Sequence, residues 1–194
     1  MLIHVWSFIK IFIEQMDGIR LFDVLFCICI AVVVALSYAF VSNKRNQPKS
    51  IGFILFVFWA ALYFEMTALI TIIRREPGTD YHSGKIVAYI YIGDLNGDAY
   101  SIRQAIYNYL NVALFIPIGF FLKGLRINSK EFKDAIITVF LGFLFSFCIE
   151  ITQIITKRGN FELNDIVTNT IGAFLGVIIF EILRRVSEYE ENKQ

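Results

Sequence analysis

Five long apolar segments run through the chain, and they restrict its possible folds more than any other feature. A helix needs about 20 apolar residues to cross the roughly 30 Å hydrocarbon core of a bilayer. Because that core offers no water to backbone N–H and C=O groups, such segments are expected to be helical. The sequence therefore predicts an all-α fold, a polytopic membrane helical bundle forming a single domain over residues 1–194. The segments cover residues 21–41, 51–73, 107–123, 133–155 and 165–183.

Composition agrees with a membrane protein and excludes several other classes. Hydrophobic residues make up 57% of the chain and charged residues 18%, whereas soluble domains average roughly 45–50% and 25%. The net charge is +1 and no block of Lys and Arg is present, so we expect no nucleic acid as a partner. The three cysteines lie in apolar segments, and we expect no disulfide, no metal and no cofactor.

Two segments outside these five have patterns of their own. Polar residues recur every three or four positions in residues 1–17, which predicts an amphipathic helix. This helix is short for a span at about 1.5 Å per residue, so it lies in the membrane interface or forms a short or re-entrant span. The alternating run Ile86–Ile92 precedes a turn and suggests a short external hairpin. The polar positions of the first segment are His4, Ser7, Lys10, Glu14 and Asp17.

Basic residues in the short loops set the predicted orientation. Cytoplasmic loops carry more Lys and Arg than external ones. Ten of the 18 basic residues fall in residues 44–49, 123–133 and 184–193, three regions that five spans place on one side of the membrane. We therefore expect a cytoplasmic C-terminus, an external N-terminus and an external loop over residues 74–106.

Polar side chains interrupt the last three apolar segments near the ends that this orientation places outside. A charge at the centre of a membrane helix costs about 2.5–3.5 kcal/mol on insertion scales, so such residues usually face protein or water and are candidates for a functional site. Asn and Gln can also simply join helices by hydrogen bonds, and that alternative stays open. Glu65 in the second segment falls at a similar depth. The candidate ligand-binding residues are Asn111, Glu150, Gln153, Arg158, Asp165 and Asn169, with Ser146 beside them.

Other residues in these segments have structural interpretations. A Gly-x-x-x-Gly pair lets two helix backbones approach closely, and a proline inside a span is expected to kink its helix. Asp165 stands where it can cap the last helix, and Arg158 is suited to pair with a carboxylate or to bind a lipid phosphate. The residues assigned a structural role are Pro117, Gly119, Gly172 and Gly176.

Three motifs in the second half of the chain, within residues 105–185, resemble those of the VanZ-like family of bacterial membrane proteins. Residues 111–120 resemble its Asn-x-x-Leu-Phe-x-Pro-x-Gly-Phe run, and residues 146–153 match its Ser-x-x-x-Glu-x-x-Gln helix. Residues 158–176 resemble its Arg/Gly-rich turn and the Asp-x-x-x-Asn-Thr-x-Gly-x-x-x-Gly helix that follows. The resemblance implies a protein of the bacterial cytoplasmic membrane linked to resistance against glycopeptide antibiotics, teicoplanin in particular.

Four functional hypotheses remain, and the first is preferred. The protein acts at the outer leaflet on a lipid or cell-wall-precursor headgroup, with membrane lipids and a lipid-linked cell-wall precursor as its partners. Alternatively, Glu150 and Asp165 are the acid and base of a membrane-embedded enzyme, although the chain has no HExxH, P-loop or nucleophile-elbow motif. The others are a lipid transporter or flippase, for which internal repeats would be expected, and a purely structural partner.

Overall fold

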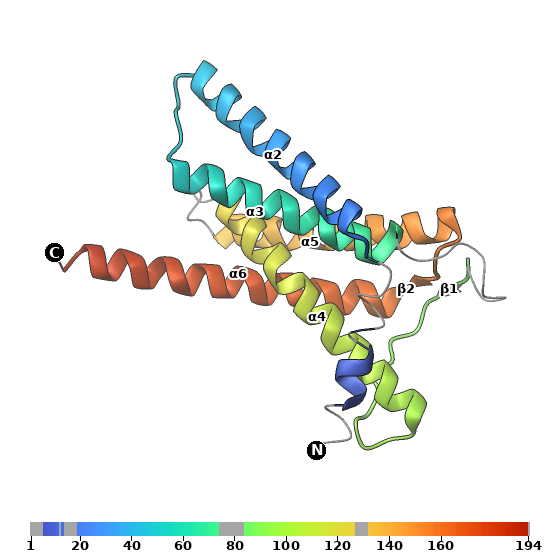
Figure 1. Cartoon of the computed structure of the whole chain (residues 1–194). Coiled ribbons are helices and arrows are strands. Elements are labelled where there is room, and N and C mark those ends of the chain that lie inside the picture. Colours follow the sequence, from blue (N-terminus) through green and yellow to red (C-terminus); the bar gives the residue numbers. More distant parts are fainter. Residues whose placement is uncertain (1–5, 12, 14–18, 74–83, 127–131, 194) are drawn as a thin grey trace. The chain divides into compact units, whose positions relative to one another are not determined.

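The computed structural model describes residues 6–11, 13, 19–73, 84–126 and 132–193 (Figure 1). Among these residues, five helices are long and apolar enough to cross a membrane. The predicted all-α polytopic membrane fold is thus confirmed. The length of the chain predicted one domain, and the internal contacts group it into two compact units, residues 16–75 and residues 1–15 with 76–194.

Only part of the predicted N-terminal amphipathic helix lies in the described region. Residues 6–11 and residue 13 are helical. Trp6 is 70% exposed and Ile13 is 60% exposed, whereas Ile11 is buried. His4, Glu14 and Asp17 lie outside the described residues.

The smaller unit is a pair of helices, α2 (Leu21–Lys44) and α3 (Ile51–Ala68), with α3 continuing as a π-helical turn, η1 (Leu69–Ile73). The side chains that α2 buries are small and recur every four residues, at Cys27, Ala31 and Ala35. Small residues in such a stripe let two helices approach closely in a membrane. The hydroxyl of Ser50 accepts the N–H of Phe53 at 3.2 Å, which caps the start of α3.

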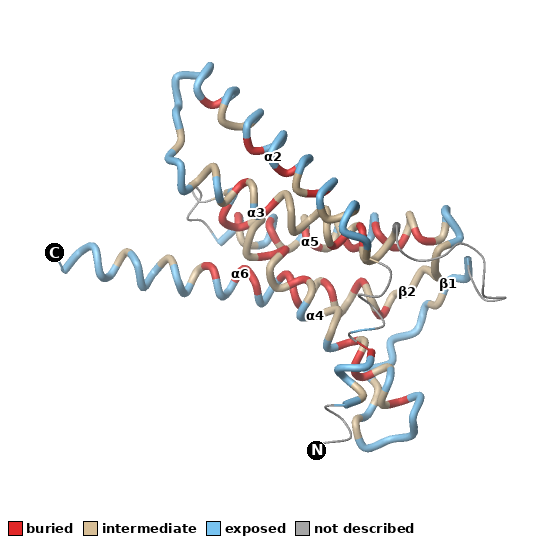
Figure 2. Tube along the Cα trace, viewed as in Figure 1, coloured by how far each residue is buried: buried red, intermediate tan, exposed pale blue. Residues whose placement is uncertain are grey.

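The larger unit contains α4 (Ala99–Leu125), α5 (Phe132–Thr156) and α6 (Leu163–Glu191). Helix α4 begins eight residues before the predicted 107, because Asp98 caps it by accepting the N–H of Ser101 at 2.8 Å. Pro117 lies inside α4 and the helix continues through it. Figure 2 shows that the buried residues of α6 lie in its first two thirds, and its C-terminal part is exposed.

Glycines bring α4 and α6 together where they cross (Figure 1). A Cβ atom at Gly119 would collide with the backbone of Ala173. On the other helix, a Cβ atom at Gly172 or Gly176 would collide with the carbonyl of Val112 or Ile116, respectively. Only glycine permits this approach, so the three glycines fix how α6 is seated against α4.

Two very short strands connect the segment before α4 to the start of α6. Strand β1 (Ile86–Val87) pairs in parallel with β2 (Phe161–Glu162). The predicted hairpin over Ile86–Ile92 is therefore wrong, because its first two residues pair with a segment 75 positions later. The strand tendency of the run is real, but its partner is the chain that leads into α6.

Candidate functional site

The turn between α5 and α6 is held in a fixed shape by the end of α5. The N–H of Arg158 donates to the carbonyl of Gln153 at 2.9 Å, and the N–H of Lys157 donates to that of Ile154 at 3.3 Å. Lys157 has a φ of 55°, so the helix ends in a Schellman motif with lysine at the position that glycine usually takes. This ending places Arg158, which is half-buried, between the two helices.

Glu150 joins the last two turns of α5 to the first residue before α6. Its side chain is 1% exposed, and its Oε2 accepts the N–H of Glu162 at 2.7 Å. Glu162 is the N-cap residue of α6. A carboxylate beside a helix N-terminus is stabilised by the helix dipole and by the unpaired N–H groups there. The sequence motif thus places a buried carboxyl group beside the N-terminus of α6.

Ser146 and Asn169 form the second link between the helices, one turn deeper. The Nδ2 of Asn169 donates to the Oγ of Ser146 at 2.9 Å, and both residues are buried. The Oδ1 of Asn169 is also buried and accepts no hydrogen bond from the described residues. A buried acceptor without a donor costs about 1–3 kcal/mol, so this atom calls for an explanation in terms of function.

Two asparagines that were not among the predicted site residues close one side of this cluster. Asn108 in α4 donates to the carbonyls of Tyr91 and Ile92 at 2.9 and 2.7 Å. Asn164 in α6 donates to the Oδ1 of Asn108 and accepts the N–H of Tyr91 at 3.3 Å. The pair therefore binds the segment before α4 to both helices. Asn108 lies three residues before Asn111, on the same face of one helix, and this spacing could have identified Asn108 as a further member of the polar cluster.

Gly93 allows the same segment to pass close to α4. Its φ is 77°, and a Cβ atom there would collide with the backbone of Ser101 and Ala105. Ser101 also accepts the N–H of Asp94 at 2.7 Å through its hydroxyl. The segment before α4 is thus fixed along α4, and it also contacts the start of α6 through Tyr91 and Asn164.

Tyrosines and helix lengths place the cluster near a membrane surface. Tyr89 and Tyr100 are each 60% exposed, and the rings of Tyr91 and Tyr100 stack with centroids 6.0 Å apart. Exposed tyrosines are typical of the headgroup level. Glu150 lies six residues before the end of α5 and Asn169 six residues after the start of α6. Both are therefore about 9 Å from a helix end, a depth close to the boundary between headgroups and hydrocarbon.

The predicted site residues fall into three groups. Glu150, Gln153 and Asn169 are buried on the neighbouring helices α5 and α6. Arg158 and Asp165 are half-buried, in the turn and in the first turn of α6. Asn111 is half-buried in α4, and its side chain forms no hydrogen bond with a described residue. Glu65 belongs to α3, in the other unit.

A second polar cluster, which we call the charge network, lies at the other end of these helices. Lys123 is 1% exposed, and its Nζ is 2.6 Å from Asp134 and 3.1 Å from Glu181. Lys123 was predicted to lie in a loop, whereas it lies inside α4 and is buried. Glu181, a carboxylate within the apolar run of α6, was the sequence feature that could have predicted this network. Its members are Lys123, Arg126, Asp134, Glu181, Arg184 and Glu188.

Chemically, the α5–α6 cluster offers hydrogen-bond acceptors, amide groups and one nearby guanidinium, without a metal-binding arrangement. No group of three or more His, Cys, Asp or Glu side chains among the described residues has metal-binding geometry. Amides and carboxylates suit hydroxyl and amine groups, while Arg suits phosphate. The arrangement therefore offers hydrogen-bonding groups for hydroxyl, amine or phosphate groups.

Comparison with known proteins extends the matched region beyond the second half of the chain. A family model described as VanZ/LLP1 matches residues 22–184. The match includes the α2–α3 pair as well as α4, α5 and most of α6. No curated protein and no solved structure matches the chain.

Proposed function

The chain belongs to the VanZ/LLP1 family, and we propose that it binds the polar headgroup of a membrane lipid or of a lipid-linked cell-wall precursor. The proposed site is the cluster formed by Ser146, Glu150, Gln153 and Asn169, with Arg158 at its edge. In this proposal the cluster lies in the outer leaflet of the bacterial cytoplasmic membrane and the C-terminus is cytoplasmic. Headgroup binding then underlies resistance to glycopeptide antibiotics of the teicoplanin type.

The observation that carries the proposal is the buried Oδ1 of Asn169, which, like the Oε1 of Gln153, has no donor among the described residues. A hydroxyl or amine of a bound headgroup would supply that donor. Residues that serve only to join helices are expected to pair both of their polar atoms. The amide of Asn169 pairs only one, with Ser146.

Arg158 supports an anionic ligand. It lies half-buried in a turn whose backbone is fixed by two hydrogen bonds. A guanidinium can hold phosphate oxygens by two parallel hydrogen bonds. The exposed tyrosines beside the cluster favour a position at headgroup level. A phosphate next to sugar or peptide groups matches this mixture of side chains.

A paired substitution separates binding from helix joining. Ser146→Ala with Asn169→Leu replaces both partners of one hydrogen bond by apolar groups, which can be nearly neutral for folding. We expect this double variant to reach normal membrane abundance and to lose resistance to teicoplanin in an expressing strain. Thr168→Val is the matched control on α6, because the Thr168 hydroxyl bonds only to carbonyls of its own helix. Resistance retained by the double variant would mean that the pair only joins α5 to α6.

Glu150→Gln tests the enzyme alternative. The substitution preserves the shape of the side chain and an acceptor for the Glu162 N–H, but a neutral amide cannot transfer a proton. We expect partial function from this variant, since acceptance of that N–H and of ligand donors is preserved. Complete loss of function in Glu150→Gln, with normal abundance, would favour acid–base chemistry instead.

A further inference from the structure

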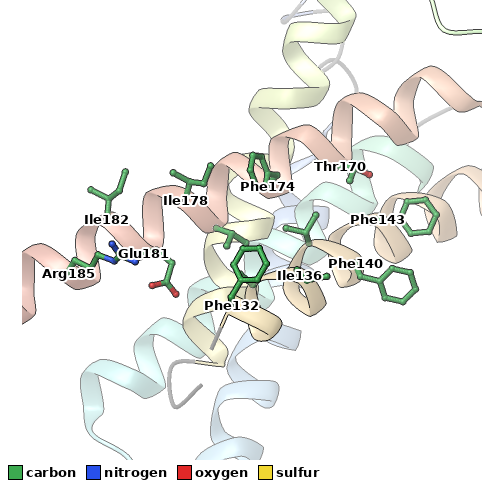
Figure 3. A pocket seen from close by; sticks show the side chains of 13 residues that line it. Phe132, Ile136, Phe140, Phe143, Thr170, Phe174, Ile178, Glu181, Ile182 and Arg185 are labelled. Atoms are coloured by element: carbon green, nitrogen blue, oxygen red, sulfur yellow. The ribbon is translucent and has the colours of Figure 1, made fainter. Parts of the chain in front are cut away.

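A groove of about 720 Å³ lies between α5 and α6, toward the end that carries the charge network. Ten of its 13 lining residues are apolar. Figure 3 shows these side chains along the two helices, with Glu181 and Arg185 at one end. The lining includes Phe132, Ile136 and Phe140 from α5, and Phe174, Ile178 and Arg185 from α6.

Arg185 is the cation at the end of this groove that the charge network does not use. The two oxygens of Glu181 are engaged by Lys123 at 3.1 Å and by Arg184 at 2.6 Å. Asp134 is engaged by Lys123 and Arg126. No described residue forms an ion pair or hydrogen bond with the exposed Arg185 side chain. Its guanidinium is therefore available to an anion from outside the chain.

The groove has the length of one lipid chain in one leaflet. Its lining extends over 12 residues of α5, from Phe132 to Phe143, and over 16 of α6, from Thr170 to Arg185. At a rise of 1.5 Å between neighbouring residues, these stretches measure about 16 and 22 Å from first to last residue, against about 15 Å for half of the hydrocarbon core. Arg185 lies six residues before the end of α6, about 9 Å from it, near the level of a lipid phosphate.

We propose that this groove binds one acyl chain of an anionic phospholipid whose phosphate contacts Arg185. The apolar lining contacts the acyl chain and separates it from other lipids of the bilayer. The guanidinium favours an anionic headgroup over a neutral one. This lipid belongs to the leaflet at the C-terminal end of α6. The site is separate from the Glu150–Asn169 cluster, and it does not depend on the function proposed for that cluster.

Native mass spectrometry of the purified full chain tests the proposal, with phosphatidylglycerol and phosphatidylcholine as probes. We expect wild-type protein to retain phosphatidylglycerol preferentially, and Arg185→Gln to lower that apparent affinity roughly tenfold. Arg185→Lys keeps the charge and should retain most of the binding. Lys193→Gln, at another exposed cation of the same chain end, should change little.

A second variant tests the groove itself. Ala135→Phe places a large side chain in the lining and should weaken binding of both lipids, while Thr168→Val, outside the lining and the proposed headgroup site, should leave both unchanged. Equal effects of Arg185→Gln and Lys193→Gln would overturn the headgroup contact. Unchanged lipid binding by folded Ala135→Phe would show only general lipid association at the protein surface. If Ala135→Phe does not fold, the Arg185 series alone decides between these outcomes.

Discussion

Among the described residues, Lys123 and Asp134 are buried charges with partners of opposite charge, whereas two buried amides, Gln153 and Asn169, each keep an oxygen without a hydrogen bond. Lys123 and Asp134 are each 2% exposed at the side chain, and each has a second partner of opposite charge, Glu181 and Arg126 respectively. The desolvation cost of such charges is met only while the partners remain in place. In contrast, the Oδ1 of Asn169 and the Oε1 of Gln153 are buried without a donor among the described residues, so the proposed site holds two acceptors that a ligand could satisfy.

Asp134→Ala should be strongly destabilising for this reason. It leaves Lys123 buried with one carboxylate partner instead of two, and breaking a buried pair costs about 3–5 kcal/mol. The matched control is Glu188→Ala, which removes an ion pair of Arg184 whose carboxylate side chain is 42% exposed. Such a pair contributes about 0–1 kcal/mol. Thermal unfolding in detergent should therefore separate the two variants clearly, and similar midpoints would show that the charge network does not hold the helices together.

Residue spacing predicted Glu150, Gln153 and Asn169 as members of one cluster, because polar groups in apolar segments have few tolerable positions. It did not predict that Asn108 bonds Asn164, because the two are 56 positions apart and nothing local encodes such a pairing. It also assigned Lys123 to a loop. A basic residue at the end of an apolar run is usually expected to extend its charged end into water at the membrane surface.

At the scale of secondary-structure elements, the contact of α4 with α6 depends on the absence of side chains. Gly119, Gly172 and Gly176 each meet the backbone of the opposite helix. The Gly-x-x-x-Gly spacing predicted a close approach of two helices, but it could not say which helix is the partner. The parallel β1–β2 pair could likewise not be predicted, because strands of two residues are too short to show a periodic pattern in the sequence.

Gly176→Ala should disrupt this contact. Its new Cβ atom would overlap the carbonyl of Ile116 and the N–H of Phe120, so α6 must move away from α4. Gly52→Ala is the control within α3, since its Cβ atom would meet only the Ser50 hydroxyl, at 4.0 Å. An exposed Gly→Ala change in a helix is favourable by about 0.5–1 kcal/mol. The expected result is a lower unfolding temperature for Gly176→Ala and an unchanged or higher one for Gly52→Ala; the reverse order would contradict the packing described.

Over the molecule, five helices among the described residues are long and apolar enough to cross a membrane, as the lengths of the apolar segments predicted. The predicted orientation rests on the basic residues of the short loops. Three of those residues, Lys123, Arg126 and Arg184, are engaged by carboxylates of the charge network. The same residues thus contribute to the positive charge of that side and to the packing of α4, α5 and α6.

Cysteine labelling of intact cells tests the orientation. In a background lacking Cys27, Cys29 and Cys148, a cysteine at Asn96, in the exposed turn before α4, should react with an impermeant reagent. Cysteines at Asn46 and Lys193 should react only after the membrane is opened. The predicted external position 80 lies outside the described residues. Labelling of Lys193 from outside would reverse the topology and move the Glu150–Asn169 cluster to the inner leaflet.

The most direct test of the proposed headgroup site measures binding to purified protein. Native mass spectrometry with an undecaprenyl-linked precursor, which carries phosphate and sugar groups, would compare wild type, Arg158→Ala and Lys85→Ala. Lys85 is the matched control, because it is an exposed cation at the same end of the unit, with its carbonyl bonded to Phe161. We predict that Arg158→Ala weakens binding roughly tenfold, as expected for loss of a charge-assisted hydrogen bond, and that Lys85→Ala has little effect. Equal small losses for both variants would reflect general surface electrostatics and would contradict a headgroup site between α5 and α6.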